Sequence, residues 1–551
     1  MQKFDLTGLK PCHRLIAERP IWASKLVCII AIALPWLNPA AGGPSAVMQP
    51  WLIAAAGTLL LWVFVAPVFT RARLVLAIGA GALLITVGRG SPSVLLAVAS
   101  LAVMAASRAV GAASGSRAWI ARSTADGWVV AALTSSLLAL VQYFGASSSF
   151  APWINPTEAG EAFANLRQRN HFATLTSIGL AALLWQRQRG SRVWWAYPGA
   201  VLLAVANAAS ASRTGALQIG LVAVLTLWWC RPFDRRVAGV CLIAVLAYGA
   251  AAVSLPLLLE QMTGLTAPNA LGRWVSGEGC ASRTILWGNV LHLIAQKPWW
   301  GWGWGELDYA HFATLYPGPR FCDILDNAHN LPLHLAVELG IPAATLAIGG
   351  FGVWVVRQRP WHETDPTRRM AWSVIAVILL HSLLEYPLWY GPFQMAFGFS
   401  LGLLATGRSP AEIPTVGWVG RATVSTSLAI ALLFSALDYH RVSQLYTPPD
   451  ERSGWSLSRP LARVGDSWLF RDQLAFAELS TTPLTRDNAV RLHALATELL
   501  HYSPEPRVID IAIESAVLLQ LDGEAGWLLA RYRVAFPDDY EKWSKAGGLR
   551  R

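Results

Sequence analysis

Residues 51–69 read WLIAAAGTLLLWVFVAPVF, nineteen residues without one charged side chain. The hydrocarbon core of a bilayer is spanned by about 20 predominantly apolar residues in a helix. Two further runs have the same character, LVCIIAIALPWL at 26–37 and VVAALTSSLLALVQYF at 129–144. The whole chain is 54% hydrophobic and only 14% charged, whereas soluble domains carry about 25% charged residues. The sequence therefore predicts an all-α, polytopic transmembrane helical bundle.

We count about thirteen candidate spans, which begin near residues 22, 50, 73, 92, 127, 171, 194, 214, 237, 330, 371, 388 and 422. The first resembles a secretory signal, but further spans follow it at once, so we interpret it as an uncleaved anchor. The predicted transmembrane domain is 1–440, with one long outer loop at 260–328, and 441–551 form a separate tail.

The formal net charge of +11 reflects topology rather than nucleic-acid binding. Arg and Lys crowd alternate connections between the spans, for example at 187–192, 231–236 and 357–369. This alternation follows the rule that cytoplasmic loops carry the excess of positive charge. The rule predicts a cytoplasmic N-terminus, and an odd number of spans then predicts a tail on the outer side of the membrane.

The tail differs from the rest of the chain because its apolar residues recur at helical spacing between charged ones. Three helices are predicted, at 488–502, 507–523 and 524–543, with Gly523 and the Pro504/Pro506 pair between them. Paired helices of this length are typical of tetratricopeptide-like hairpins, although a generic helical cap would have the same pattern.

Two of the six cysteines, Cys280 and Cys322, fall in the long outer loop. In an oxidising compartment this pair could close the loop as a disulfide, and the alternative is two free thiols. No CxxC or HExxH motif is present, so the sequence predicts no metal site.

Several arginines break the charge rule because they lie near the outer ends of spans. They are Arg167, Arg169, Arg213, Arg283 and Arg320. A single arginine at such a place is typical of a side chain that reaches lipid phosphate. A set on one side of the membrane, with few acidic residues in the spans, favours an anionic ligand, because guanidinium groups bind phosphate oxygens in pairs.

His329 lies beside these arginines, in the stretch CDILDNAHNLPLHLAVELG (322–340), where a polar loop becomes an apolar helix. A neutral imidazole can accept a proton from a hydroxyl group, so His329 is a candidate general base. The alternative is a helix-start histidine bonded to Asp326. His334 and Glu338, four residues apart on the same helix, are interpreted as a buried structural pair. His381 and Glu385 repeat that spacing.

The order of five motifs resembles the bacterial O-antigen ligase/polymerase superfamily, and within it the PglL-type protein O-oligosaccharyltransferases. The motifs are NLRQRNHFATL, SASRTG, SRTILWGNVL with GWGWGE, DNAHNLPLHLAVELG and HSLLEYPL, and they cover about residues 150–405. Residues before 150 match only as generic spans.

The resemblance implies roles for individual residues. It implies that His329 is catalytic, that Arg213 and Arg283 hold a pyrophosphate, and that Gln168 and Tyr386, or less favourably Tyr390, bind substrate. We add the neighbouring Arg167 and Asn330 as substrate-binding candidates. Many relatives have a smaller residue where this chain has Arg169, so its assignment to the pyrophosphate is left open.

The function that the resemblance implies is transfer of a preassembled glycan from undecaprenyl pyrophosphate to a hydroxyl group, at the periplasmic face of the bacterial inner membrane. No nucleotide sugar, ATP, metal or other cofactor is expected. The tail favours a periplasmic protein as acceptor, either pilin-like or another protein with exposed Ser or Thr. Direct displacement would invert the configuration at the sugar carbon.

Two alternatives use other acceptors or another class of function. Lipid A core as acceptor would make the chain an O-antigen ligase, and a second lipid-linked glycan would make it a polymerase. A transporter of lipid-linked sugars is a more distant alternative, because transporters tend to carry charges at the membrane midplane and repeated halves.

Overall fold

The computed structural model describes residues 21–40, 43–65, 92–115, 117–189, 195–230, 233–266, 279–405, 418–452 and 467–547. Within these residues every regular element is a helix, which confirms the predicted all-α class. The span predicted near residue 73 and the N-terminus predicted to be cytoplasmic lie outside the described residues.

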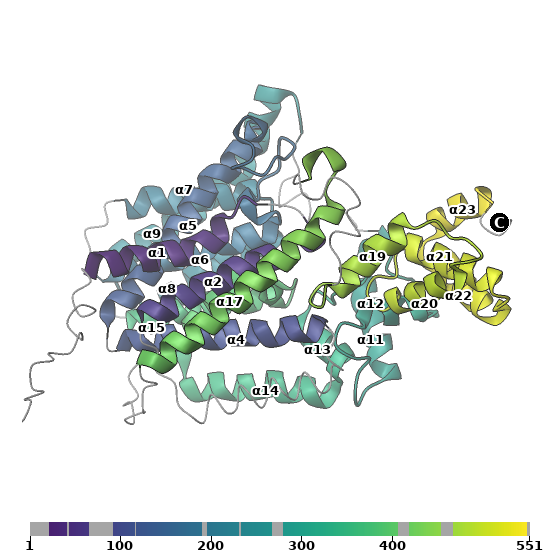
Figure 1. The fold of residues 1–551 in the computed structure, drawn as a ribbon. Coiled ribbons are helices and arrows are strands. Elements are labelled where there is room, and N and C mark those ends of the chain that lie inside the picture. The colour runs from purple at the N-terminus through teal and green to yellow at the C-terminus, as the bar shows by residue number, and fades with distance from the viewer. Residues whose placement is uncertain are drawn as a thin grey trace, which may run out of the picture.

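Long helices form the bundle at the left and centre of Figure 1. They are α1 (Ile21–Leu37), α2 (Met48–Phe64), α4 (Pro92–Ala112), α5 (Ala118–Tyr143), α6 (Arg169–Gln188), α7 (Ala196–Ala209), α8 (Arg213–Trp229), α9 (Arg235–Thr263), α14 (Ile341–Gln358), α15 (Pro366–Ser382), α16 (Gly391–Leu403) and α17 (Trp418–Ser443). Four of these helices, α4, α5, α9 and α17, are long and apolar enough to cross a bilayer. The chain is a membrane protein, while the count of about thirteen spans remains a prediction.

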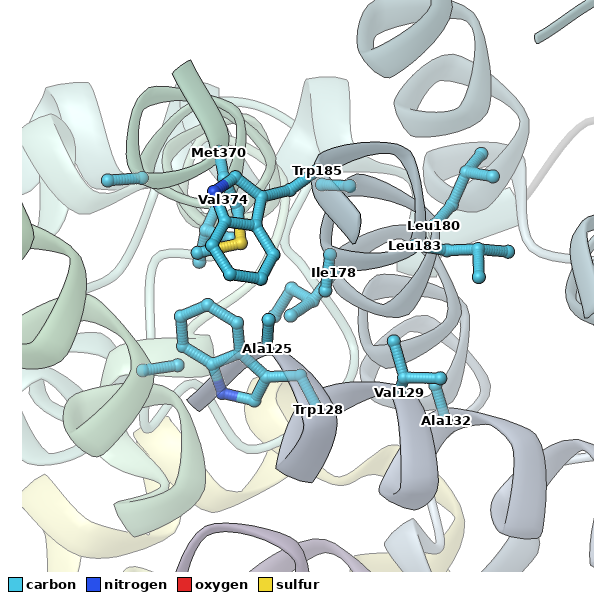
Figure 2. Close-up of a cluster of buried hydrophobic side chains, with 14 of the residues drawn as sticks. Ala125, Trp128, Val129, Ala132, Ile178, Leu180, Leu183, Trp185, Met370 and Val374 are labelled. Atoms are coloured by element: carbon cyan, nitrogen blue, oxygen red, sulfur yellow. The ribbon is translucent and has the colours of Figure 1, made fainter. Parts of the chain in front are cut away.

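The bundle core is built from large side chains of neighbouring helices. Trp128 of α5 and Trp185 of α6 are at least 95% buried and extend toward each other, with Met370 of α15 beside Trp185 (Figure 2). Ile178 of α6 lies between the two helices in the same view. These contacts fix α5, α6 and α15 relative to one another, and the loops at the ends of α6 and α15 carry part of the site described below.

The run predicted as a single span from about residue 330 is two helices, α13 (Leu331–Leu339) and α14. The break is at Gly340, whose φ of +86° is a conformation that favours glycine. Its backbone also approaches Trp299 closely, because a Cβ at Gly340 would lie 2.3 Å from the Trp299 carbonyl oxygen. Pro342 is the second residue of α14, a position where proline is favourable. The break lets α13 belong to the outer loop rather than to a straight transmembrane helix.

The long outer loop has its own small core. It contains α11 (Arg283–Gln296) and α12 (Leu307–Ala313), whose apolar residues pack with Phe321, Leu325 and Val337. The Trp287 indole nitrogen donates to the Ala328 carbonyl oxygen at 3.1 Å. These contacts hold α11 beside the segment that carries His329.

Residues 467–547 of the tail form five α-helices, drawn from green to yellow at one end of the bundle in Figure 1. They are α19 (Arg471–Thr481), α20 (Ala489–Leu499), α21 (Pro506–Leu518), α22 (Asp522–Ala535) and α23 (Pro537–Lys545). Each of α20 to α23 packs on the next, as helical hairpins do. The tetratricopeptide-like assignment and the boundary at 440/441 remain predictions, and α17 runs without interruption through that boundary.

The tail helices pack against the outer loop through α12. Phe312 of α12 belongs to the tail's apolar core. The His501 ring stacks on Tyr309 with centroids 3.8 Å apart, and its Nδ1 lies 2.7 Å from the Glu306 carboxylate. Arg531 donates to the Ala313 carbonyl oxygen at 2.7 Å. The tail is thus attached to the same loop that carries the candidate catalytic residues.

Candidate active site

The Glu385 carboxylate, in the loop between α15 and α16, brings distant candidate residues together. Its Oε2 lies 2.7 Å from His329 Nδ1. Its Oε1 accepts hydrogen bonds from Arg283 Nη2 at 2.5 Å and from Asn170 Nδ2 at 3.2 Å. These four residues are called the Glu385 cluster below.

The N-termini of four helices meet at the Glu385 cluster, and a side chain caps each of them. The capping residues are Gln168 for α6, Ser212 for α8, Ser282 for α11 and Asn330 for α13. Ser212 also donates to Asn170 Oδ1 at 2.6 Å, and Asn330 donates to the Leu383 carbonyl oxygen at 3.2 Å. Helix N-termini carry partial positive charge. Four of them beside two arginines favour an anionic ligand.

His329 is held firmly at its backbone as well as at its ring. Its φ is +49°, a left-handed conformation that is uncommon for residues other than glycine. Its peptide N–H donates to Asn327 Oδ1 at 2.9 Å. Such strained backbone is found where surrounding contacts fix a functional side chain. The sequence alternative of a bond to Asp326 is not what the structure has, because the ring contacts Glu385 instead.

The charges in the cluster determine the protonation of Glu385. Burial alone would raise its pKa, but the hydrogen bond from His329 and the positive charges of His329 and Arg283 outweigh burial and lower the pKa from 4.5 to about 2. An ionised carboxylate can only accept hydrogen bonds. His329 Nδ1 therefore carries the hydrogen that it donates to Glu385, and in the neutral form of the ring Nε2 holds the lone pair that a general base needs.

The cluster is closed on the Glu385 side and open on the other. The Glu385 side chain is 8% exposed, whereas the His329 and Arg283 side chains are 27% and 30% exposed. Arg283 Nη1 has no hydrogen-bond partner within the described residues. One nitrogen of this guanidinium is thus fixed on Glu385, and another is buried without a partner among the described residues.

Two tyrosines extend the site along the loop that follows Glu385. The Tyr386 ring meets the His329 ring edge to face, with centroids 5.1 Å apart. Tyr390 stacks on Tyr386 at 6.2 Å and contacts His171 at 4.2 Å. Of the two tyrosines left open by the sequence, Tyr386 is the one in contact with His329.

Three further predicted arginines lie in different surroundings. Arg213 is the first residue of α8, directly after the Ser212 that bonds Asn170. Arg169 instead forms an ion pair with Glu161 at 3.2 Å. Arg320 donates to the Thr314 carbonyl oxygen at 3.0 Å and belongs to the outer loop. Arg169 and Arg320 thus each have a local acceptor outside the Glu385 cluster, and the prediction that the five outer arginines form one ligand-binding set remains a prediction.

Arg167 and Gln168 lie in the loop before α6. Arg167, with a φ of +56°, donates to the carbonyl oxygens of Pro39 and Ala40. Gln168 accepts from the His171 N–H at 2.9 Å and so caps α6. Both line a pocket beside Tyr390.

Two members of the Glu385 cluster are missing from the sequence-based set. Asn170 lies within the motif NLRQRNHF, beside residues that were selected, and Glu385 was noted only for its spacing from His381. In the structure His381 Nδ1 instead lies 2.8 Å from the Thr174 hydroxyl. His334 and Glu338 form the buried pair that was predicted, with 3.4 Å between Nε2 and Oε2.

Cys280 and Cys322 form a disulfide in the structure, with Cα atoms 5.6 Å apart. It joins the residues just before α11, which begins at Arg283, to the segment that leads to His329. In the part of the chain that the structure describes, no group of three or more His, Cys, Asp or Glu residues is placed to hold a metal ion.

We expect the double variant Cys280→Ser/Cys322→Ser to be less stable, because the disulfide closes a loop of 42 residues. Loss of such a cross-link costs about 3–4 kcal/mol in the chain-entropy model. Thermal unfolding of the detergent-solubilised protein measures the effect, and dithiothreitol should reproduce it in the wild type. A double variant that still responded to dithiothreitol would contradict this assignment.

Three known families match parts of the chain. A family described as O-antigen ligase matches residues 198–348, a protein glycosylation ligase family matches 162–185, and the C-terminal part of a virulence factor membrane-bound polymerase family matches 369–548. The resemblance to the O-antigen ligase family is confirmed. These three segments contain Gln168, Arg213, Arg283, His329 and Glu385.

Two curated relatives come from Acinetobacter baylyi. The general O-oligosaccharyltransferase is 25% identical over 327 residues, which are 57% of this chain and 56% of the relative. The ComP-specific O-oligosaccharyltransferase is 24% identical over 250 residues, which are 45% of this chain and 44% of the relative. The matches thus span about half the length of each relative.

Proposed function

We propose that the chain is an oligosaccharyltransferase that moves a preassembled glycan from undecaprenyl pyrophosphate to Ser or Thr hydroxyl groups of periplasmic proteins. The observation that carries the proposal is the Glu385 cluster, in which one carboxylate orients both a base, His329, and a cation, Arg283. The names of the relatives support the class of reaction.

In the proposed reaction one bond forms and one bond breaks at the anomeric carbon of the donor sugar. The acceptor hydroxyl oxygen forms a bond to the anomeric carbon while its proton passes to His329 Nε2. The bond from that carbon to the pyrophosphate oxygen breaks, and the electron pair leaves with the pyrophosphate. Attack opposite the leaving group inverts the anomeric carbon. Glu385 stabilises the positive charge that the His329 ring gains.

In this proposal the arginines stabilise the negative charge that develops on the pyrophosphate. Arg283 Nη1 is buried and lacks a protein partner among the described residues, so we propose that it turns toward the pyrophosphate when the donor binds. Arg213 begins α8, next to the Ser212–Asn170 contact. Cationic groups fixed before the reaction lower the barrier because they need no rearrangement as charge develops. In this mechanism protein cations do the work that nucleotide or metal activation does elsewhere, so we propose that neither is required.

The proposal also includes the side of the membrane on which the Glu385 cluster lies and the protein that accepts the glycan. We propose that the cluster lies on the periplasmic side of the inner membrane and that the C-terminal helical domain (441–551) binds the acceptor protein. The attachment of the tail to α12 supports this role, because α12 lies in the loop that continues to His329.

The experiment compares intact masses of periplasmic proteins from cells with and without this chain. We expect a constant glycan increment on Ser or Thr peptides only when the chain is present. An O-antigen ligase onto lipid A core is the second candidate, favoured by the family match at 198–348. If lipopolysaccharide lost its O-antigen while protein masses stayed unchanged, the ligase would replace our proposal.

A further inference from the structure

His381 is a buried histidine that the proposed reaction does not use. It lies one helical turn before Glu385, at the end of α15, and is 0% exposed. Its carbonyl oxygen accepts a hydrogen bond from the Glu385 N–H at 2.8 Å. Its ring Nδ1 lies 2.8 Å from the Thr174 hydroxyl oxygen of α6. His381 therefore connects the backbone of Glu385 to α6.

Thr174 completes a closed path back to the Glu385 carboxylate. Its hydroxyl donates to the Asn170 carbonyl oxygen at 2.9 Å, and Asn170 Nδ2 donates to Glu385 Oε1 at 3.2 Å. Glu385 is thus held at its N–H and at its carboxylate by groups that are hydrogen-bonded to one another. We use the name His381 network for four residues, His381, Thr174, Asn170 and the Gln218 described below.

The direction of the bond between His381 and Thr174 follows from the surroundings of the imidazole. His381 Nε2 is buried and has no hydrogen-bond partner among the described residues. An unpaired buried N–H is rarer in proteins than an unpaired acceptor, so we assign the ring hydrogen to Nδ1, which donates to Thr174. The Thr174 hydrogen is then free for the Asn170 carbonyl oxygen at 2.9 Å, a closer acceptor than Gln218 Oε1 at 3.1 Å.

Gln218 of α8 fixes the same hydroxyl group from a third helix. Its Nε2 donates to Thr174 Oγ1 at 2.8 Å and to the Val377 carbonyl oxygen of α15 at 2.9 Å. Gln218 and Thr174 are both 0% exposed, like His381. A buried polar network of this kind holds its members in one arrangement. One hydroxyl group thus joins α6, α8 and α15 inside the bundle.

The other two partners of the Glu385 carboxylate lie outside the bundle interior. His329 and Arg283 belong to the outer loop, and their side chains are 27% and 30% exposed. Asn170 is therefore the member of the Glu385 cluster that ties the carboxylate to the buried helices. The position of the carboxylate relative to the bundle depends on what holds Asn170 and the Glu385 backbone in place.

We propose that His381 and Thr174 are positioning residues that set the Glu385 carboxylate and, through it, the direction of the His329 ring. The inference rests on the proposed function, in which His329 is the base. Catalytic groups need to be held to within about 0.5 Å by the residues around them. The His381 network supplies such support from the interior of the bundle, where Glu385 and His329 themselves lie in loops.

Thr174→Val tests this role, because valine has nearly the shape of threonine and lacks only the hydroxyl group. Thr176→Val is the matched control. Thr176 lies on the same helix and is 1% exposed, but its hydroxyl accepts from Asn207 Nδ2 of α7 at 2.7 Å and is not part of the network. Each variant removes one buried hydroxyl from α6, so both should lower the melting temperature similarly. Turnover and donor affinity are measured with the purified full-length protein, a lipid-linked donor and an acceptor protein.

We expect Thr174→Val to lower kcat by about tenfold or more, because displaced catalytic groups react slowly even when the substrate is bound. Its dissociation constant for the donor should stay within about threefold of wild type, and Thr176→Val should keep kcat within about twofold. Thr174→Ser restores the hydroxyl and should recover most of the turnover. Equal kcat in the two valine variants, or a serine variant as slow as Thr174→Val, would overturn the inference.

Coupling to Glu385 separates positioning from a general loss of structure. In a Glu385→Asp background the carboxylate is already displaced, so Thr174→Val should lower kcat by less than about threefold. Two independent losses would instead multiply, and that result would contradict a role through Glu385. Absence of glycan transfer by the wild type would contradict the proposed function itself.

His381 is tested by two substitutions that differ in one donor. The side-chain amide of His381→Asn can place an N–H near the position of Nδ1, whereas His381→Leu cannot. We expect His381→Leu to be as slow as Thr174→Val and His381→Asn to retain more turnover than His381→Leu. An asparagine variant no faster than the leucine variant would rule out the assigned hydrogen bond as the means of positioning.

Discussion

Replacement of His329 by Ala is expected to lower kcat for glycan transfer by about 10³-fold or more, with donor binding retained. The ring is the general base in the proposed reaction, and its loss removes the group that accepts the hydroxyl proton. Turnover is measured with purified protein, a lipid-linked donor and an acceptor protein, and donor affinity is measured separately.

A second variant at position 329 is needed because of the backbone conformation of His329. Its φ of +49° is unfavourable for alanine, so His329→Ala alone would mix catalytic and folding effects. Asparagine tolerates the left-handed conformation best among non-glycine residues, and His329→Asn should be equally inactive while its melting temperature stays close to that of the wild type. His362→Ala, at an exposed histidine near the start of α15, is the control. Wild-type turnover by either His329 variant would overturn the assignment of the base.

The fold was largely predictable because apolar runs of span length leave little choice in a bilayer. Helix starts for α6, α8 and α16 lie within a few residues of the prediction. The break at Gly340 was not predicted, since the run from Leu331 is apolar throughout. It depends on the close approach of Trp299, forty-one residues earlier, which local periodicity cannot reveal.

The site was predictable in its chemistry but not in its pairing. Arginines outside the charge rule and a histidine at a helix start identified Arg283 and His329. Glu385 was missed because its nearest match in sequence is His381, four residues before it. Its actual partners are 56 and 102 residues away. Arg169 shows the opposite case, because its partner Glu161 lies only eight residues earlier, and its role in holding a pyrophosphate remains a proposal.

Glu385 should therefore be nearly as sensitive as His329, although it touches no reacting atom in our mechanism. Glu385→Gln keeps the size of the side chain and removes its charge. The amide orients His329 poorly, stabilises the protonated ring less, and leaves Arg283 without an anionic partner. We expect kcat to fall by about 10³–10⁴-fold, as when the carboxylate partner of a catalytic histidine is neutralised.

A pH profile separates this positioning role from a purely structural one. The pKa of Glu385 is lowered to about 2, so wild-type Glu385 is ionised throughout the range above about pH 4. Its ionised form stabilises the fold above the unfolded pKa near 4.3, and that contribution is lost as the pH falls toward 2. Loss of charge in Glu385→Gln should change the acid limb of kcat/KM, because the variant has no negative charge beside the reacting groups at any pH.

Glu363→Gln is the matched control, because Glu363 forms an ion pair of similar length, 2.6 Å to Arg368, at the start of α15 rather than in the site. It should leave both kcat and the pH profile unchanged, whereas Glu385→Asp should be intermediate, since the charge is kept but the reach is shorter. If Glu385→Gln retained more than about a tenth of wild-type turnover, or if its acid limb did not move, the carboxylate would hold the loops together without controlling the base.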